Sequence, residues 1–535
     1  MAEQVLAADG RPLKASLNRA LRRQKMRALM LIAPLLLFIL VSFVMPIADM
    51  LFRSVENQIV GETLPRTVVE LADWDAAGEA EPDAAVFEAL ARDLAIAVEE
   101  KSHTRLGSRL NYELTGVSSL FRKTGRKVDE IGETVQDALE DAAPIWKERS
   151  VFGGLLGTDD WTNAVDAWDE TGAGPAFEAR PEMQAALPDT TSLYRSFTEI
   201  AMEAGDNPLT EKQLPIFFHV LAQEVTTAPT DGLSDAQAAL FADVQTTVAG
   251  LTLDDPKALF VDIDEDWGST DVWRTIQTYS PAYTDGYFLN SVDRLKGAEG
   301  AELRPENERI YITLFIRTMI MSFTITVSCI LLGYPIAWLL ANLPARKANL
   351  LMILVLLPFW TSLLVRTSAW KVLLQQQGVI NDVLVWIGFV ADDSRLQLIN
   401  NQTGTIIAMT HILLPFMILP LYSVMQTIPP SYLRAAKSLG ATNWTAFWRV
   451  YFPQSIPGIG AGSILVFILS IGYYITPEIV GGTKGVFISN RIAYHISSSL
   501  NWGLAAALGA ILLAIVLIFY WAYDRIVGID NVKLG

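Results

Sequence analysis

Cysteine is almost absent from this chain of 535 residues, and histidine is scarce. The one cysteine, Cys329, lies in an apolar run, so an intrachain disulfide is excluded and we interpret the residue as a packing side chain. The four histidines belong to no cluster with metal-ligand spacing. No Gly-x4-Gly-Lys-Ser/Thr motif occurs, so the chain does not cradle ATP phosphates in that way. These absences exclude a disulfide scaffold and give no support to an enzyme.

Charge is distributed unevenly. The formal charge is −17, yet 51% of the residues are apolar, a combination that is rare in soluble acidic proteins. Residues 53–309 hold 49 of the 58 acidic residues but only 21 of the 41 basic ones. One acidic, water-facing block is therefore inserted into an otherwise basic and apolar chain.

Apolar runs of about 20 residues, enough to cross the bilayer core as a helix, recur along the chain. They are residues 29–52, 310–340, 350–373, 405–427, 458–480 and 503–523. The first follows a basic leader, residues 1–28, as in a signal peptide. It is too long for one and lacks a small-x-small cleavage site, so we interpret it as a retained helix. The sequence predicts an all-α membrane protein with six transmembrane helices.

Basic residues near the helix ends predict the orientation. The leader places the N-terminus in the cytoplasm, and six crossings return the tail, residues 528–535, to the same side. The loop 429–457, which carries bases and no acid, is then cytoplasmic too. Lys484 and Arg491, in the last outer connection, are a mild exception.

The acidic block 53–309 then faces the periplasm, and we predict that it forms a mainly α-helical domain between the first two membrane helices. Apolar residues recur at helical spacing in residues 86–98, 110–146, 214–225 and 236–251. The basic turn 122–127 and the acidic run 262–266 are interpreted as solvated surface, with ligand and cation binding as the less favoured alternatives.

The loop 429–457 has an unusual pattern for a membrane protein. Its first half predicts a short helix that ends at Gly440, because glycine readily adopts the left-handed conformation found at helix ends. Thr442 or Asn443 is suited to cap a second short helix, which we expect Pro453 to end. The loop would form a two-helix elbow with small and aromatic residues exposed, a surface suited to a protein groove.

This loop resembles the EAA signature of permease subunits of ATP-binding-cassette (ABC) importers. Ala435 and Ala436 stand in the Ala-Ala places, Gly440 follows after three residues, and Pro453 closes the pattern at the family spacing. Arg434 stands where the family usually has glutamate. In the family this loop docks into the ATPase subunit, which implies an ATPase-coupling role for Leu433, Arg434, Ala435, Ala436, Gly440, Ala441 and Pro453.

Other segments are similar to the spermidine/putrescine-type permeases, namely residues 333–337, 357–370, 414–420, 476–482 and 501–509. Residues 267–294 look like the segment that precedes the second span in that subfamily. The resemblance implies the type I importer (MetI-like) fold, with a five-helix permease core over residues 310–527.

It also implies a function. The chain would be a bacterial inner-membrane permease, not an enzyme, that moves a small organic solute from periplasm to cytoplasm, with a polyamine favoured. Another small cation, an amino-acid derivative, a phosphonate or iron are the alternatives for the solute. A periplasmic-sensing receptor is a second alternative. An ion-coupled carrier would usually show an internal repeat of its spans, and we find none.

The implied partners are ABC ATPase subunits, a second permease and a periplasmic substrate-binding protein. The ATPases would bind ATP and magnesium, so no cofactor is expected in this chain. A permease heterodimer is favoured over a homodimer. The acidic block would contact the binding protein or gather cationic solute by its negative field.

Ionisable and aromatic residues at membrane depth are candidates for the translocation pathway, because charge is costly there. The candidates are Trp360, Arg366, Tyr473, Tyr474 and Glu478. The aromatic residues would attract ammonium groups or simply pack. Arg366 would contact solute or form an ion pair with Glu478 or Asp49, and Glu478 is the best candidate for meeting a cation. His411 is expected to bond a neighbouring helix.

Overall fold

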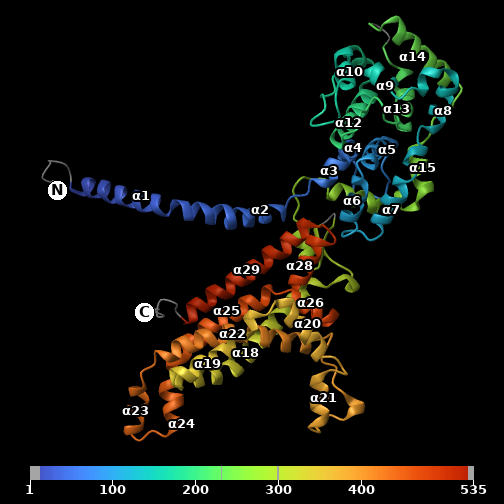
Figure 1. Cartoon of the computed structure of the whole chain (residues 1–535). Helices are drawn as coiled ribbons and strands as arrows, with labels where there is room; N and C mark the ends of the chain where they lie inside the picture. Colours follow the sequence, from blue (N-terminus) through green and yellow to red (C-terminus); the bar gives the residue numbers. More distant parts are fainter. Residues whose placement is uncertain (1–12, 77, 230–231, 298–299, 528–535) are drawn as a thin grey trace. The chain divides into compact units, whose positions relative to one another are not determined.

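The computed structural model describes residues 13–76, 78–229, 232–297 and 300–527. Within these ranges the chain is helical, apart from one two-stranded sheet, and it divides into two compact units (Figure 1). We call residues 13–55, 287–294 and 303–527 the membrane unit. Residues 56–286 and 295–302 form the insertion domain.

The membrane unit contains the apolar helices. Its elements are α1 (Leu13–Ile39), the π-helical turn η1 (Leu40–Val44), α2 (Met45–Arg53), α18 (Tyr311–Asn342), α19 (Ala345–Leu356), η6 (Leu357–Trp360), α20 (Leu363–Leu373), α21 (Val379–Trp386), η7 (Asp392–Ser394), α22 (Gln402–Gln426), α23 (Pro430–Ser438), α24 (Asn443–Ala446), the π-helical turn η8 (Phe447–Tyr451), α25 (Phe452–Gly472), α26 (Ile475–Val480), α27 (Gly482–Gly485), α28 (Ile488–Ser497) and α29 (Trp502–Val527). Short elements join the two units: α17 (Gly286–Ser291), β1 (Arg294–Gly297), β2 (Gly300–Leu303) and η5 (Glu306–Glu308).

Among the described residues, five helices are long and apolar enough to cross a membrane: Gln24–Arg53, Tyr311–Asn342, Gln402–Gln426, Asn443–Gly472 and Trp502–Arg525. A sixth candidate is the pair Ala345–Trp360 and Leu363–Leu373, which is bent by 95°. Residues 350–373, expected as one span, therefore form two helices with a sharp bend between them. Pro358 lacks the N–H that would continue the helix, and the Ser362 hydroxyl caps a new helix by accepting from the Val365 N–H at 3.2 Å.

One expectation about the spans is wrong. Pro453 does not end the short helix α24, and the next span is not residues 458–480. Pro453 lies in the first turn of α25, directly after the π-helical turn η8, and α24, η8 and α25 run on continuously to Gly472. The loop 429–457 is thus joined directly to a membrane helix.

Helices α18, α22 and α25 pack side by side through small residues (Figure 1). A Cβ added to Gly462 would lie 2.6 Å from Met417 Sδ, and one added to Gly333 would lie 3.1 Å from Met417 Cγ. Cys329 is buried, with its Sγ 3.6 Å from the Thr410 carbonyl, which confirms its packing role. Glycine at these positions lets the backbones approach closely, as in other membrane helix bundles.

The insertion domain is an assembly of short helices with its own core. They are α3 (Ile59–Thr63), α4 (Pro65–Leu71), α5 (Ala84–Glu99), α6 (Ser102–Leu110), α7 (Val117–Gly125), η2 (Val128–Glu130), α8 (Glu133–Ala142), η3 (Pro144–Lys147), α9 (Val151–Leu156), α10 (Asp159–Asp166), α11 (Pro181–Ala186), α12 (Pro188–Ala204), α13 (Pro215–Val225), α14 (Asp235–Val248), α15 (Pro256–Ile263), η4 (Glu265–Gly268) and α16 (Thr270–Thr278). Three predicted helical stretches correspond to α5, α13 and α14. The fourth, residues 110–146, is broken where Gly116 and Gly132 take positive φ angles of 106° and 93°.

Aromatic residues fill the core of the insertion domain. Trp273 packs edge-on against Phe87 with ring centroids 4.8 Å apart, and it lies 5.4 Å from the ring of Trp267. Both indole N–H groups are satisfied, the Trp267 group by Thr124 Oγ1 at 2.8 Å. Residues 267–278 therefore belong to the core of this domain.

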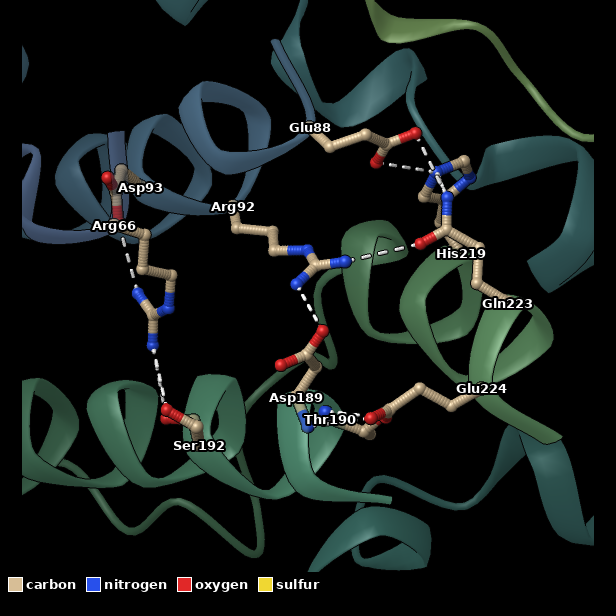
Figure 2. Close-up of polar contacts among 10 residues, drawn as sticks. All are labelled: Arg66, Glu88, Arg92, Asp93, Asp189, Thr190, Ser192, His219, Gln223 and Glu224. Atoms are coloured by element: carbon tan, nitrogen blue, oxygen red, sulfur yellow. Dashed lines mark hydrogen bonds and ion pairs between the residues drawn. The ribbon is translucent and has the colours of Figure 1, made fainter. Parts of the chain in front are cut away.

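Ion pairs and hydrogen bonds join α4 and α5 to α12 and α13 (Figure 2). Arg66 pairs with the buried Asp93 at 3.1 Å, and Arg92 pairs with Asp189 at 2.6 Å. The Glu88 carboxylate accepts from the Gln223 amide at 3.0 Å. In this groove the charged groups neutralise one another, so we interpret it as a structural joint between helices.

The two charged segments noted in the sequence meet in space. Lys123 Nζ lies 2.5 Å from Asp264 Oδ2 and donates to it, which lowers the pKa of that carboxyl below its ordinary value. The two segments meet at this one ion pair, and their other charged side chains are exposed, as expected of solvated surface: Arg122, Arg126, Lys127, Asp262, Glu265 and Asp266.

Candidate functional site

The elbow of residues 430–446 is built by local turn chemistry. Helix α23 ends in a Schellman motif: the Gly440 N–H donates to the Lys437 carbonyl and the Ala441 N–H to the Ala436 carbonyl, both at 3.0 Å. Gly440 has a φ of +89°, which favours glycine. Thr442 then caps α24 by accepting from the Thr445 N–H at 3.2 Å.

The elbow exposes large apolar side chains. Leu439 is 90% exposed, Trp444 72% and Tyr432 52%. In Figure 1, α23 and α24 extend from the ends of α22 and α25 and away from the helix bundle. Single exposed apolar residues are ordinary, but several on one projecting turn form a surface suited to a protein partner.

The predicted coupling residues occupy three different environments. Leu433 is half-buried and packs against the core of the membrane unit, where it anchors α23. Ala436 and Ala441 are also half-buried. The exposed residues are Arg434, Ala435, Gly440 and Pro453. The accessible surface of the elbow thus comprises the side of α23 that carries Arg434 and Ala435, together with the Gly440 turn.

Aromatic contacts tie the elbow to the bundle. Phe447 of η8 packs edge-on against Tyr334 of α18 with centroids 6.1 Å apart, and Trp448 lies 4.8 Å from the ring of Phe452. The Tyr334 hydroxyl also lies 3.0 Å from the Ser455 hydroxyl of α25. Because protein interiors are close-packed, displacement of the elbow is transmitted to α18 and α25 instead of being absorbed locally.

Two interrupted helices meet at the pathway candidates. One is the bent α19–η6–α20 segment, and the other is the break between α25 and α26 at residues 473–474. Thr367 of α20 and Thr476 of α26 are hydrogen-bonded at 3.1 Å and buried. Helix breaks at membrane depth are tolerated where they are buried in protein or line a cavity, and they commonly mark binding sites.

Tyr473, in the break after α25, is half-buried and packs against the core of the membrane unit, and His411 lies on α22. His411 accepts from Trp370 Nε1 of α20 at 3.1 Å, which confirms that it bonds a neighbouring helix.

Glu478 belongs to a second group. Its carboxylate accepts from the Asn490 amide at 2.5 Å, and the same amide donates to the Tyr474 carbonyl at 2.9 Å. Glu478 is exposed, as is Tyr474, whose exposed fraction is 46%. Trp360, at the end of η6, is 71% exposed.

The structure settles the suggested ion pair of Arg366. Arg366 forms no ion pair with any described residue, and its Nε is buried without a hydrogen-bond partner. Asp49 instead pairs with Arg53 at 3.0 Å. The interpretation of Arg366 as the partner of Glu478 or Asp49 is therefore wrong.

Three residues of this region escaped the sequence analysis as site residues: Thr367, Trp370 and Asn490. The only sign of these residues in the sequence is the pair of helix breaks at Pro358 and Gly472, because their hydrogen-bond partners lie on other helices. In the part of the chain that the structure describes, no group of three or more His, Cys, Asp or Glu side chains is arranged to hold a metal ion.

Comparison with known proteins agrees with this architecture. Residues 316–527 match the family model described as "Binding-protein-dependent transport system inner membrane component". The spermidine/putrescine transport system permease protein PotB of Salmonella typhimurium (strain SL1344) is 34% identical over 220 residues, 41% of this chain and 76% of that protein. The inner membrane ABC transporter permease protein YdcU of Escherichia coli (strain K12) is 32% identical over 227 residues, 41% of this chain and 72% of that protein.

A solved bacterial ABC transporter involved in the import of the acidic polysaccharide alginate is also similar. It is 22% identical, covers 50% of this chain and 99% of that chain, and has a TM-score of 0.32.

The fold defines a multi-pass membrane protein with a projecting two-helix elbow. The chain belongs to the family of inner-membrane components of binding-protein-dependent transport systems. It is a transport permease and not an enzyme. The match begins at residue 316, so the insertion domain lies outside it.

Proposed function

We propose that this chain is one permease subunit of an ABC importer that carries a polyamine, such as spermidine or putrescine, into the cytoplasm. The names of its PotB relatives support this choice of solute. In this proposal the chain crosses the membrane six times, with the bent pair α19–α20 as one crossing. Both termini lie in the cytoplasm, and the insertion domain lies in the periplasm.

The observation that carries the proposal is the elbow around Gly440, which exposes Leu439 and Trp444 and is joined through Phe447 to Tyr334 of α18. A separate ATPase binds ATP and magnesium and grips this elbow. A second permease, most simply a different chain, and a periplasmic binding protein complete the assembly. Closure of the ATPase pair moves the elbow and switches the pathway between its two accessible states.

The solute path is assigned to the break between α25 and α26. Glu478 offers a carboxylate, and Tyr473 and Tyr474 offer ring faces, with each cation–π contact contributing about 0.5–2 kcal/mol. Helix α25 ends at Gly472, so its last carbonyls add partial negative charge that favours a cation. Trp360 and Arg366 are further candidate contacts, while Trp370 of α20 is hydrogen-bonded to His411 of α22.

The test is reconstitution of the chain with its ATPase, second permease and binding protein in proteoliposomes. Spermidine or putrescine should stimulate ATP hydrolysis and accumulate inside. Glu478→Gln should raise KM by up to about fivefold, since a charge pair at an exposed carboxylate contributes about 0.2–1 kcal/mol. Asp393→Asn, an exposed carboxylate in the α21–α22 connection, should change nothing.

A different result would be ATP hydrolysis that responds not to polyamines but to one of the alternative solutes: another small cation, an amino-acid derivative, a phosphonate or iron. That result would keep the importer assignment and change the assigned solute. No ATP hydrolysis coupled to any solute would contradict the importer assignment and leave the receptor alternative.

A further inference from the structure

The start of α28 fastens the break between α25 and α26. The Ser489 hydroxyl donates to the Ile471 carbonyl near the end of α25 at 2.6 Å. The Ile488 N–H donates to Thr318 Oγ1 of α18 at 2.9 Å. All four of these residues are buried. Because α28 is bonded to both α18 and α25, its first turn lies at a fixed place beside the break.

The side-chain amide of Asn490, in this first turn, is bonded at both ends. Its Oδ1 accepts from the Phe487 N–H at 2.9 Å, so its amino group is the part that faces the break. The amino group donates to the Tyr474 carbonyl at 2.9 Å and to Glu478 Oε2 at 2.5 Å. Asn490 is only 7% exposed. Together these bonds leave the amide a single orientation.

The negative charge of Glu478 is held in place but not neutralised. Within the described part of the chain, the carboxylate forms no ion pair and its Oε1 accepts no hydrogen bond. An amide is a neutral donor, whereas Arg or Lys in its place would cancel the charge. Ionised groups in membrane segments are usually paired unless they face a cavity or a solute path. The bond from Asn490 therefore orients a charge that stays available to a ligand.

We propose that Asn490 is a positioning residue of the translocation pathway: it holds the Glu478 carboxylate beside the α25–α26 break and leaves Oε1 free for a cation. A glutamate side chain loses rotamer freedom when it binds a ligand, and a donor that already fixes it removes that loss from the binding step. The unpaired carboxylate selects for positive charge, whichever organic cation carries it. The inference rests on the proposed function, in which Glu478 contacts the solute.

The test is a double-mutant cycle in proteoliposomes that contain the chain with its ATPase, second permease and binding protein. Putrescine is the probe. Asn490→Ala should raise KM as far as Glu478→Gln does, up to about fivefold, and leave kcat within about twofold of wild type. In the double variant Glu478→Gln/Asn490→Ala, KM should rise no further than in Glu478→Gln, because Asn490 acts on KM only through the carboxylate.

Asn381 of α21 provides a matched control. It is also a buried asparagine, and its amide donates to the Gln375 and Leu396 carbonyls at 3.1 and 2.9 Å and accepts from the Leu396 N–H at 3.0 Å. Asn381→Ala removes as many hydrogen bonds as Asn490→Ala but none to Glu478. A purely structural effect would appear in both variants, so Asn381→Ala should leave KM unchanged.

A reciprocal variant, Glu478→Gln/Asn490→Asp, keeps the test decisive if Asn490→Ala fails to fold. The introduced amide can donate to the introduced carboxylate, so the bond and the charge are both kept. The charge then lies at the buried position 490 and not at the exposed position 478. We expect KM to stay at the value of Glu478→Gln, whereas a purely structural role for the bond predicts the KM of wild type.

Four results would each overturn the inference while uptake by wild type upholds the proposed importer. They are a wild-type KM in Asn490→Ala or in Glu478→Gln, additive increases in the double variant, an equal increase in Asn381→Ala, and recovery of KM in the reciprocal variant. Absence of putrescine-coupled uptake by wild type would contradict the proposed function and this inference together.

Discussion

Substitution of Gly440 tests the coupling role directly, because a side chain at this residue would cause backbone strain but no steric clash. A Cβ added there would meet no atom within 4 Å, while φ is +89°. Gly440→Ala therefore costs only left-handed strain, about 1–2 kcal/mol. This lowers the equilibrium ratio of intact to disrupted elbow by a factor of about 5–30. Gly440→Glu adds a charged side chain to the surface that we assign to the ATPase.

Gly388, in the connection after α21, is a matched control. Its φ is +80°, and an added Cβ would also meet no atom within 4 Å. The Ala and Glu variants of Gly388 should impose the same local strain without contacting an ATPase.

The assay is solute-stimulated ATP hydrolysis and uptake in proteoliposomes, with unfolding of the isolated chain measured in parallel. We expect Gly440→Ala to reduce coupling by at most about 30-fold and Gly440→Glu to abolish it. The matched variants of Gly440 and Gly388 should lower the thermal midpoint by similar small amounts, since they impose the same local strain and leave the buried contacts of α18, α22 and α25 untouched. Normal uptake by Gly440→Glu, or equal losses in Gly388→Glu, would refute the reasoning.

Three predictions concern the insertion domain. Arg66→Met leaves the carboxylate of Asp93, which is fully buried, without its cation and should destabilise the domain by about 3–5 kcal/mol in denaturant unfolding. The double variant Arg66→Met/Asp93→Asn should recover part of the lost free energy of unfolding. Additive losses from the two substitutions would argue against an interaction between Arg66 and Asp93. Lys123→Met should lower the thermal midpoint above pH 3.8 but not well below it, because the lowered pKa of Asp264 contributes stability only where that carboxyl is ionised. Glu99→Gln should raise the midpoint at neutral pH, where ionisation of a carboxyl with a raised pKa opposes folding; this gain should vanish below pH 4.5. A midpoint difference that did not vary with pH would contradict either assignment.

The elbow could be predicted from the sequence because its geometry is set locally. A glycine after the Ala-Ala helix specifies the left-handed turn, and Thr442 caps the next helix from two residues beyond that glycine. The pairing of Lys123 with Asp264 could not be predicted, since 141 residues separate the two side chains in the sequence.

The number of apolar runs could be predicted from the sequence, but the shape of the membrane helices could not. Hydropathy averages over about 20 residues and hides a break such as that between Trp360 and Leu363. The same averaging concealed the continuity of α24 with α25, because Pro453 is compatible with a helix start as well as a helix stop. The burial of Trp267 and Trp273 depends on tertiary contacts to Phe87, which no local pattern reveals.

The two strands of chain that lead into and out of the insertion domain are fastened to each other. Glu56 and Tyr283 form an antiparallel bridge, and the Asn57 side chain donates to the Tyr279 carbonyl at 2.5 Å and to the Pro281 carbonyl at 3.2 Å. Because these bonds hold the two ends of the domain close together, a linker of a few residues in place of residues 58–281 would connect them without stretching the backbone. A gene rearrangement that removed or exchanged residues 58–281 would leave the membrane unit with its reading frame and its fold.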